Sequence, residues 1–72
     1  MREYLKSMRE AQGLTLQDIA DKIGISRQYY QLIESGERQK KMDITLVTKI
    51  AGIFNVSPET IIEYEIMEKA VN

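Results

Sequence analysis

The fold of this chain is decided by residues 15–35, which read TLQDIADKIGISRQYYQLIES. Thr15 and Asp18 have the spacing of a capping box, in which each side chain accepts a hydrogen bond from the other residue's backbone N–H at a helix start. Leu16 and Ile19 then begin a series of apolar residues at helical spacing, so one face of this segment is apolar. The stretch therefore predicts a short amphipathic helix at its beginning.

A second short helix is expected after a tight turn. Gly24 ends the first helix, because glycine adopts the left-handed conformation without a steric cost. Ser26 is a favourable N-cap for the next helix, and Ile25 between them is expected to point back as an apolar plug. Tyr30 is predicted to lie in the core, and Gly36 ends the second helix as Gly24 ends the first. Two helices joined by a short glycine-containing turn form a helix-turn-helix unit.

Polar side chains occupy the first turn of the second helix. Arg27 and Gln28 follow the predicted cap directly. Arginine and glutamine can form paired hydrogen bonds with guanine and adenine, respectively. A plain helical hairpin in a small bundle, with these side chains as solvated surface, explains the same spacing. The spacing alone therefore leaves open whether this helix reads DNA.

Three more helices are expected around this pair. Residues 2–12 carry an apolar stripe, and a second segment, capped by an aspartate, covers residues 44–54. Asn55 is expected in the left-handed conformation that ends a helix. Pro58 then marks the first position of a final helix over about residues 58–70, because proline suits the start of a helix. The pattern predicts one all-α domain over residues 1–72.

Composition excludes several classes of function. The 72 residues include no cysteine and no histidine, which removes disulfides, thiolate metal sites and the commonest general base. No catalytic constellation, metal site or cofactor is therefore expected, and a small-molecule ligand is not expected either. No apolar run approaches the ~20 residues that a membrane span needs, and no signal peptide is visible. We expect a non-enzymatic cytoplasmic protein without membrane contact.

Charge is unevenly distributed along the chain. The total is −1, but residues 1–54 hold nine Lys/Arg against seven Asp/Glu, and residues 55–72 hold one lysine against four glutamates. The first part is therefore +2 and the tail −3. A local basic surface is enough for contact with phosphates. The glutamates of the tail are expected to be solvated, away from any bound duplex.

The sequence resembles the Cro/C1-type helix-turn-helix family, the phage-repressor-like or XRE-like group. Its members read roughly L-R-x-x-x-G-L-T-Q-x-x-L-A-x-x-L-G-I-S-x-x-x-I-S-x-I-E-x-G, and the match extends over about residues 5–62. The matching positions are Arg9, Gly13, Leu14, Thr15, Ile19, Ala20, Ile23, Gly24, Ile25, Ser26, Ile33, Glu34 and Gly36. The resemblance implies a compact five-helix, lambda-repressor-like DNA-binding domain with the helix-turn-helix at its second and third helices.

The resemblance also implies which side chains read bases. By position these are Arg27 for guanine, Gln28 for adenine and Leu32, whose expected role is an apolar contact with a thymine methyl group. Leu32 is alternatively a rim residue of the core. Tyr29 stands where the family has a small polar residue, so its hydroxyl reaches a phosphate or its ring covers the edge of the core.

Other positions are expected to contact the DNA backbone. The family's glutamine at the start of the first motif helix is replaced by Leu16, so Gln17 either takes over its backbone contact or is merely solvated. The loop over residues 36–43 is longer than in the family and has two adjacent lysines in place of a proline. The complete set of backbone or secondary contacts is Gln17, Ser26, Tyr29, Gln31, Arg38, Lys40 and Lys41.

The resemblance further implies a structural ion pair between Arg9 and Glu34. Such a pair adds little net stability, but deleting one partner leaves an uncompensated charge. We therefore interpret Arg9 as structural and not as a contact to DNA.

The last helix has more apolar residues than one stripe can bury. The candidates for a homodimer contact are Ile62, Ile66, Met67 and Val71. Together these observations favour a transcriptional regulator, expected to be a repressor, that binds double-stranded DNA as a homodimer on a pseudo-palindromic operator. The alternative is a protein-interaction module, such as an antitoxin or adaptor, that binds a protein partner through the last helix.

Overall fold

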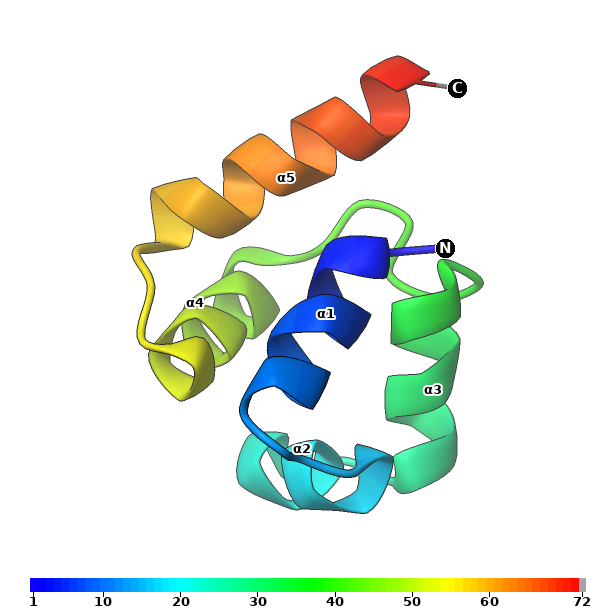
Figure 1. Ribbon diagram of the computed structural model, residues 1–72. Helices are drawn as coiled ribbons and strands as arrows, with labels where there is room; N and C mark the ends of the chain where they lie inside the picture. Colours follow the sequence, from blue (N-terminus) through cyan, green and yellow to red (C-terminus); the bar gives the residue numbers. More distant parts are fainter. Residues whose placement is uncertain (72) are drawn as a thin grey trace.

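Five helices make up the regular structure of the described residues, and none of these residues forms a strand. The computed structural model describes the backbone of residues 1–71 and the side chains of residues 1–68. The helices are α1 Glu3–Ala11, α2 Leu16–Ile23, α3 Arg27–Ser35, α4 Ile44–Phe54 and α5 Pro58–Val71. In Figure 1, α1 (blue) stands between α3 and α4, α2 crosses at one end, and α5 crosses at the other. The predicted all-α fold and its five helices are confirmed.

The predicted caps form at the helix starts. Thr15 Oγ1 accepts a hydrogen bond from the Asp18 N–H (3.0 Å), and Asp18 Oδ2 accepts one from the Thr15 N–H (2.9 Å), which completes the capping box. Asp43 caps α4 through the Leu46 N–H at 2.8 Å. Asn55 ends α4 with φ 57°, the left-handed conformation expected for it. These caps satisfy backbone groups that helix ends leave without partners, so they set most of the helix boundaries.

Helix α1 is shorter than the predicted 2–12 by one residue at each end. Arg2 and Gln12 are its flanking caps, and Arg2 makes no capping hydrogen bond with its side chain. The Arg2 side chain instead turns inward and is buried. Gly13, with φ 68°, carries the chain away from the helix end. The periodicity of the sequence located this helix correctly, but the tertiary contacts of Arg2 displaced its start.

A single apolar core joins all five helices. Tyr30 is fully buried as predicted, and Ile25 packs against the core as the expected plug. The buried apolar residues are Tyr4, Leu5, Ile19, Ala20, Ile23, Tyr30, Ile33, Leu46, Val47, Ile50, Ala51, Phe54 and Ile61. None of the helices in the described part of the chain has the length and apolar character that a bilayer crossing requires.

Helix α5 is attached to α1 by one aromatic and several polar contacts. The rings of Tyr4 and Tyr64 stack with centroids 4.9 Å apart and planes 5° from parallel. Glu65 Oε2 accepts a hydrogen bond from the Tyr4 hydroxyl at 2.6 Å. The expectation that the tail glutamates are all solvated is therefore wrong for Glu65, because its carboxylate has only 13% exposure and lies against two side chains from the N-terminus.

Two buried tyrosines differ in how their hydroxyls are satisfied. The Tyr4 hydroxyl donates to Glu65, whereas the Tyr30 hydroxyl is buried without a hydrogen-bond partner among the described residues. Burial raises the pKa of both phenols, and the neighbouring glutamates, Glu65 for Tyr4 and Glu34 for Tyr30, raise it further. Both phenols therefore stay neutral in the folded protein at neutral pH.

The same substitution at these two tyrosines is expected to have opposite effects. Tyr30→Phe removes a buried hydroxyl without a partner and should raise the free energy of unfolding by about 1 kcal/mol. Tyr4→Phe removes a hydrogen bond to a charged group and should lower it by about 1.5 kcal/mol. Urea unfolding followed by circular dichroism measures both changes. Equal destabilisation by the two variants would contradict the difference between the two hydroxyls.

Candidate nucleic-acid interface

The turn between α2 and α3 fixes how the second helix leaves the first. Gly24 has φ 91°, where a residue with a Cβ atom is strained, so it ends α2 and redirects the chain. Ile25 packs against the core, and Ser26 Oγ accepts a hydrogen bond from the Tyr29 N–H at 3.1 Å. The start of α3 is thus held by one apolar contact and one cap, with its first turn facing outward.

Helix α3 has a buried face and an exposed face. Tyr30, Ile33 and Glu34 are buried, whereas Arg27 and Gln28 are exposed in the first turn. Gln31 is also exposed and Leu32 is partly exposed; they follow Gln28 by three and four residues, so all three lie side by side on the helix. All three side chains that the resemblance assigned to base reading therefore reach the surface, Arg27 and Gln28 as exposed residues and Leu32 as a partly exposed one.

An ion pair ties the far end of α3 to α1. Arg9 Nη2 lies 3.0 Å from Glu34 Oε1, and Arg9 Nε lies 3.1 Å from Glu34 Oε2, so the two planar groups meet through two parallel bonds. Arg9 Nη1 also donates to the Leu14 carbonyl at 3.0 Å. Donating these hydrogen bonds to the Glu34 carboxylate raises the pKa of Arg9. The side chains have 12% and 5% exposure, which leaves Arg9 in a structural position behind the exposed face of α3.

Tyr29 lies between the exposed face of α3 and the loop over residues 36–43. Its ring packs against the core, and its hydroxyl accepts a hydrogen bond from Gln39 Nε2 at 2.9 Å. Gln39 Oε1 in turn accepts a hydrogen bond from the Asp43 N–H at 3.3 Å. Tyr29 thus supports the loop from inside, and its hydroxyl proton stays available as a donor.

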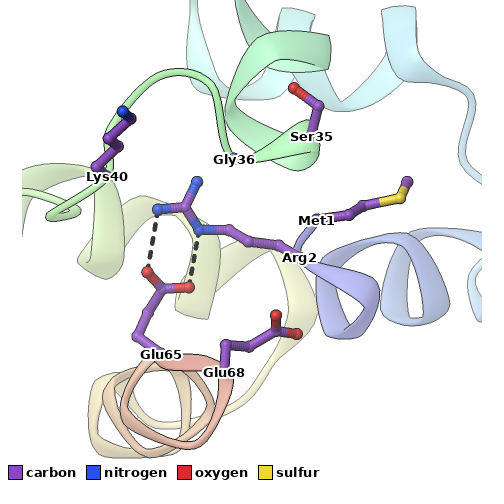
Figure 2. A pocket seen from close by; sticks show the side chains of 7 residues that line it. All are labelled: Met1, Arg2, Ser35, Gly36, Lys40, Glu65 and Glu68. Carbon is purple, nitrogen blue, oxygen red and sulfur yellow. Dashed lines mark hydrogen bonds and ion pairs between the residues drawn. The ribbon is translucent and has the colours of Figure 1, made fainter. Parts of the chain in front are cut away.

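The loop after α3 presents three cations. Arg38, Lys40 and Lys41 are exposed within four consecutive positions. Lys40 also lines an open pocket with Arg2 and Glu65, as Figure 2 shows. The only contact that the Arg38 guanidinium shows among the described residues is a long one, 3.5 Å, to the adjacent Glu37 carbonyl. The loop therefore carries concentrated positive charge directly after the exposed face of α3.

The start of α2 contributes differently from the family pattern. Leu16 is partly buried and packs against the core, so it serves stability in place of the family's polar contact. Gln17 is exposed, and its amide donates to Asp21 Oδ1 at 2.7 Å, one turn further along α2. Gln17 therefore lies on the surface of the helix-turn-helix unit beside the exposed N-terminus of α2.

Sequence reasoning missed Arg2 as a residue of structural importance. Its backbone N–H donates to the Glu34 carbonyl at 2.8 Å, which places the N-terminus at the end of α3. Its Nε forms an ion pair with Glu65 Oε2 at 2.8 Å (Figure 2), and the arginine side chain has 6% exposure. No local pattern links residues 63 positions apart, so the sequence held no indication of this contact.

The outer face of α5 is apolar and exposed. Ile62, Ile66 and Met67 have 42%, 62% and 60% exposure. Ile62 and Ile66 also line a groove with Met42 and Val47 from the preceding loop and α4. The remaining dimer candidate, Val71, lies outside the residues whose side chains are described.

The described residues hold no group of three or more acidic side chains placed to bind a metal ion. The exposed face of α3 and the loop that carries Arg38, Lys40 and Lys41 form adjoining polar surface among these residues. Exposed Arg and Gln side chains on a helix, flanked by Arg and Lys, match the hydrogen-bonding edges and the phosphates of a nucleic acid duplex.

Comparison with known proteins agrees with this geometry. The sequence matches the family described as helix-turn-helix over residues 5–61. It is 37% identical over 67 residues to the uncharacterized HTH-type transcriptional regulator YqaE of Bacillus subtilis (strain 168), covering 93% of this chain and 56% of that protein. It is 38% identical over 65 residues to the uncharacterized HTH-type transcriptional regulator MJ0272 of Methanocaldococcus jannaschii, covering 90% of this chain and 96% of that protein. The chain thus spans little more than half of the first relative and nearly all of the second. No solved structure matches the chain.

Proposed function

Because the chain belongs to the helix-turn-helix family, we propose that it is a sequence-specific DNA-binding transcriptional regulator that reads the major groove with α3. The observation that carries this proposal is the exposed face of α3, where Arg27 and Gln28 lie free of the core while the opposite face is buried. A helix held rigidly from behind can enter a groove without losing its position. A bacterial regulator with this role binds its DNA in the cytoplasm.

Base reading follows from the chemistry of the exposed side chains. The Arg27 guanidinium can donate two hydrogen bonds to guanine O6 and N7, and the Gln28 amide can pair with adenine N6 and N7. Leu32, partly exposed one turn after Gln28, contacts a thymine methyl group. These three side chains specify sequence, each at its own position in a half-site.

Backbone contacts supply most of the affinity. Arg38, Lys40 and Lys41 lie in the loop next to α3 and neutralise phosphates, while Gln17, Ser26, Tyr29 and Gln31 add hydrogen bonds around the same surface. The overall charge of −1 does not oppose this role, because Arg38, Lys40 and Lys41 are exposed together and Arg2 neutralises the nearby Glu65 carboxylate within the protein. Such contacts fix the orientation of the protein on the duplex.

A homodimer is the proposed assembly, with α5 as the contact. Ile62, Ile66 and Met67 are exposed apolar side chains on one helix, and burying them against a second copy is favourable. Two α3 helices would then enter successive major grooves about 34 Å apart on a pseudo-palindromic operator. Occupying such an operator excludes other proteins from it, which is the action of a repressor.

The same observation supports a second candidate function. The exposed apolar face of α5 fits a different protein as well as a second copy, as in an antitoxin or an adaptor. A stable complex with another protein that leaves the DNA affinity unchanged would favour this alternative.

Selection of bound sequences from random duplex DNA tests the proposed function. We expect an enriched inverted repeat whose half-site centres lie about one helical turn apart, or about 34 Å. With up to about eight phosphates neutralised per dimer, the logarithm of affinity should fall with the logarithm of salt concentration at a slope of about −7. Flat enrichment with only weak, salt-sensitive binding would overturn sequence-specific regulation and favour the interaction module.

Two arginines offer a matched test of base reading. Arg27→Ala should cost about 1–3 kcal/mol of binding free energy and relax the preference at one position of each half-site. Arg38→Ala, the same change in the loop, should weaken binding to all sequences equally and reduce the salt slope by about 1 per subunit. Binding measured on a panel of single-base operator variants separates the two. A uniform loss for Arg27→Ala would remove it from the base-reading set.

Two exposed isoleucines offer a matched test of the dimer. Ile66→Glu introduces a charge into the proposed contact on α5 and should convert the protein to a monomer, because a charge is costly to bury in an apolar interface. Ile44→Glu, at a position with 78% exposure on α4, should leave the dimer intact. Sedimentation velocity measures both, and a dimeric Ile66→Glu variant would show that α5 is not the interface.

A further inference from the structure

Arg2 uses its whole hydrogen-bonding capacity inside the protein. An arginine side chain has five N–H donors. In Arg2, Nε and Nη2 donate to the Glu65 carboxylate at 2.8 and 3.1 Å, and Nη1 donates to the Ile33 carbonyl at 2.5 Å. Nη1 donates also to the Arg38 carbonyl at 3.1 Å, and Nη2 donates to the Gln39 carbonyl. A buried guanidinium with five internal bonds has no donor left for a phosphate.

The acceptors of Arg2 join three parts of the fold that are distant in sequence. Glu65 belongs to α5, Ile33 to the last turn of α3, and Arg38 and Gln39 to the cationic loop. Figure 2 shows the guanidinium between α5 and the loop, with Glu65 on one side and the loop that carries Lys40 on the other. Arg2 is thus a single cation that connects α3, the loop and α5.

Contacts other than those of Arg2 also hold the loop, since the Gln39 side chain bonds Tyr29 and the Asp43 N–H, and Met42 packs against the core. The Glu37 and Arg38 N–H groups donate to the Leu32 carbonyl at 2.9 and 3.1 Å. Gln39 has φ 55°, a left-handed conformation that is uncommon for a residue with a side chain. Such a conformation persists only where the surroundings hold it. Tyr29 and Asp43 hold the side chain of Gln39, and the Arg2 bonds to the Arg38 and Gln39 carbonyls hold its backbone from the buried side.

We propose that Arg2 is a positioning residue for DNA binding, which holds the loop in the conformation that presents Arg38, Lys40 and Lys41 to the phosphates. The inference rests on the proposed function and adds a residue that does not itself reach the duplex. Since Glu65 orients the same guanidinium, α5 and the cationic loop are mechanically connected through one side chain.

Arg2→Lys is the decisive variant. Lysine keeps the charge, so the electrostatic field of the protein changes little. It has three donors at one point, however, and cannot reach a carboxylate and three separate carbonyls as the planar guanidinium does. Arg9→Lys is the matched control, because it makes the same change in the other arginine–glutamate pair, whose contacts are Glu34 and Leu14 and not the loop.

Amide hydrogen exchange in the protein without DNA tests the loop directly. Arg2→Lys should accelerate exchange at least several-fold at the Glu37 and Arg38 amides, relative to core amides of the same variant. Arg9→Lys should leave the ratio of loop to core exchange unchanged, even where it lowers overall stability. Unchanged loop exchange in Arg2→Lys would overturn the proposal, whatever happens to DNA binding.

The salt dependence of operator binding tests the consequence, at a temperature where each variant is fully folded. Losing one phosphate contact per subunit should make the slope shallower by about 0.9 per subunit in Arg2→Lys than in the wild-type protein. A loosened loop with wild-type affinity and slope would overturn the positioning role while leaving the proposed function intact. A wild-type protein that binds no DNA would overturn the proposed function itself, and the exchange data would still show whether Arg2 holds the loop.

Discussion

The geometry of the candidate interface depends on the ion pair between Arg9 and Glu34. Helix α3 has only nine residues, and Tyr30 and Ile33 anchor it in the apolar core. The pair joins the two planar groups through two bonds at 3.0 and 3.1 Å and so sets the register of α3 against α1. A partly buried pair of this kind contributes little net stability, and its value lies in fixing one arrangement.

A second arginine performs a related task at the other end of α1. Arg2 brings the acidic helix α5 against the N-terminus, and the Glu65 carboxylate is thereby neutralised within the protein. The stacked rings of Tyr4 and Tyr64 reinforce this attachment. As a result, the acidic tail is folded onto the side of the molecule where the N-terminus and the end of α3 meet, and the cationic loop is supported by the same contacts.

The helix-turn-helix motif was predicted from the sequence, whereas the long-range contacts that hold it in place were not. The caps at Thr15 and Ser26 and the turn at Gly24 act between residues at most four apart, so their spacing was informative. The resemblance paired Arg9 with Glu34, but nothing paired Arg2 with Glu65, and the tail glutamates were wrongly expected to be uniformly solvated. The sequence also could not predict that the Tyr30 hydroxyl lacks a hydrogen-bond partner among the described residues. Apolar periodicity predicts that a side chain is buried, but it does not show which groups surround its hydroxyl.

The sequence by itself determined the five helices, their caps and the face of α3 that stays exposed, because these follow from backbone hydrogen bonding and apolar periodicity within a few turns. Only the tertiary structure decided what holds that face in place. Arg2 meets Glu65 because the chain returns across α1 after three further helices, and a contact between residues so far apart depends on the packing of the whole core. The side chains proposed to meet DNA are thus set by local sequence, and the loop beside them by long-range packing.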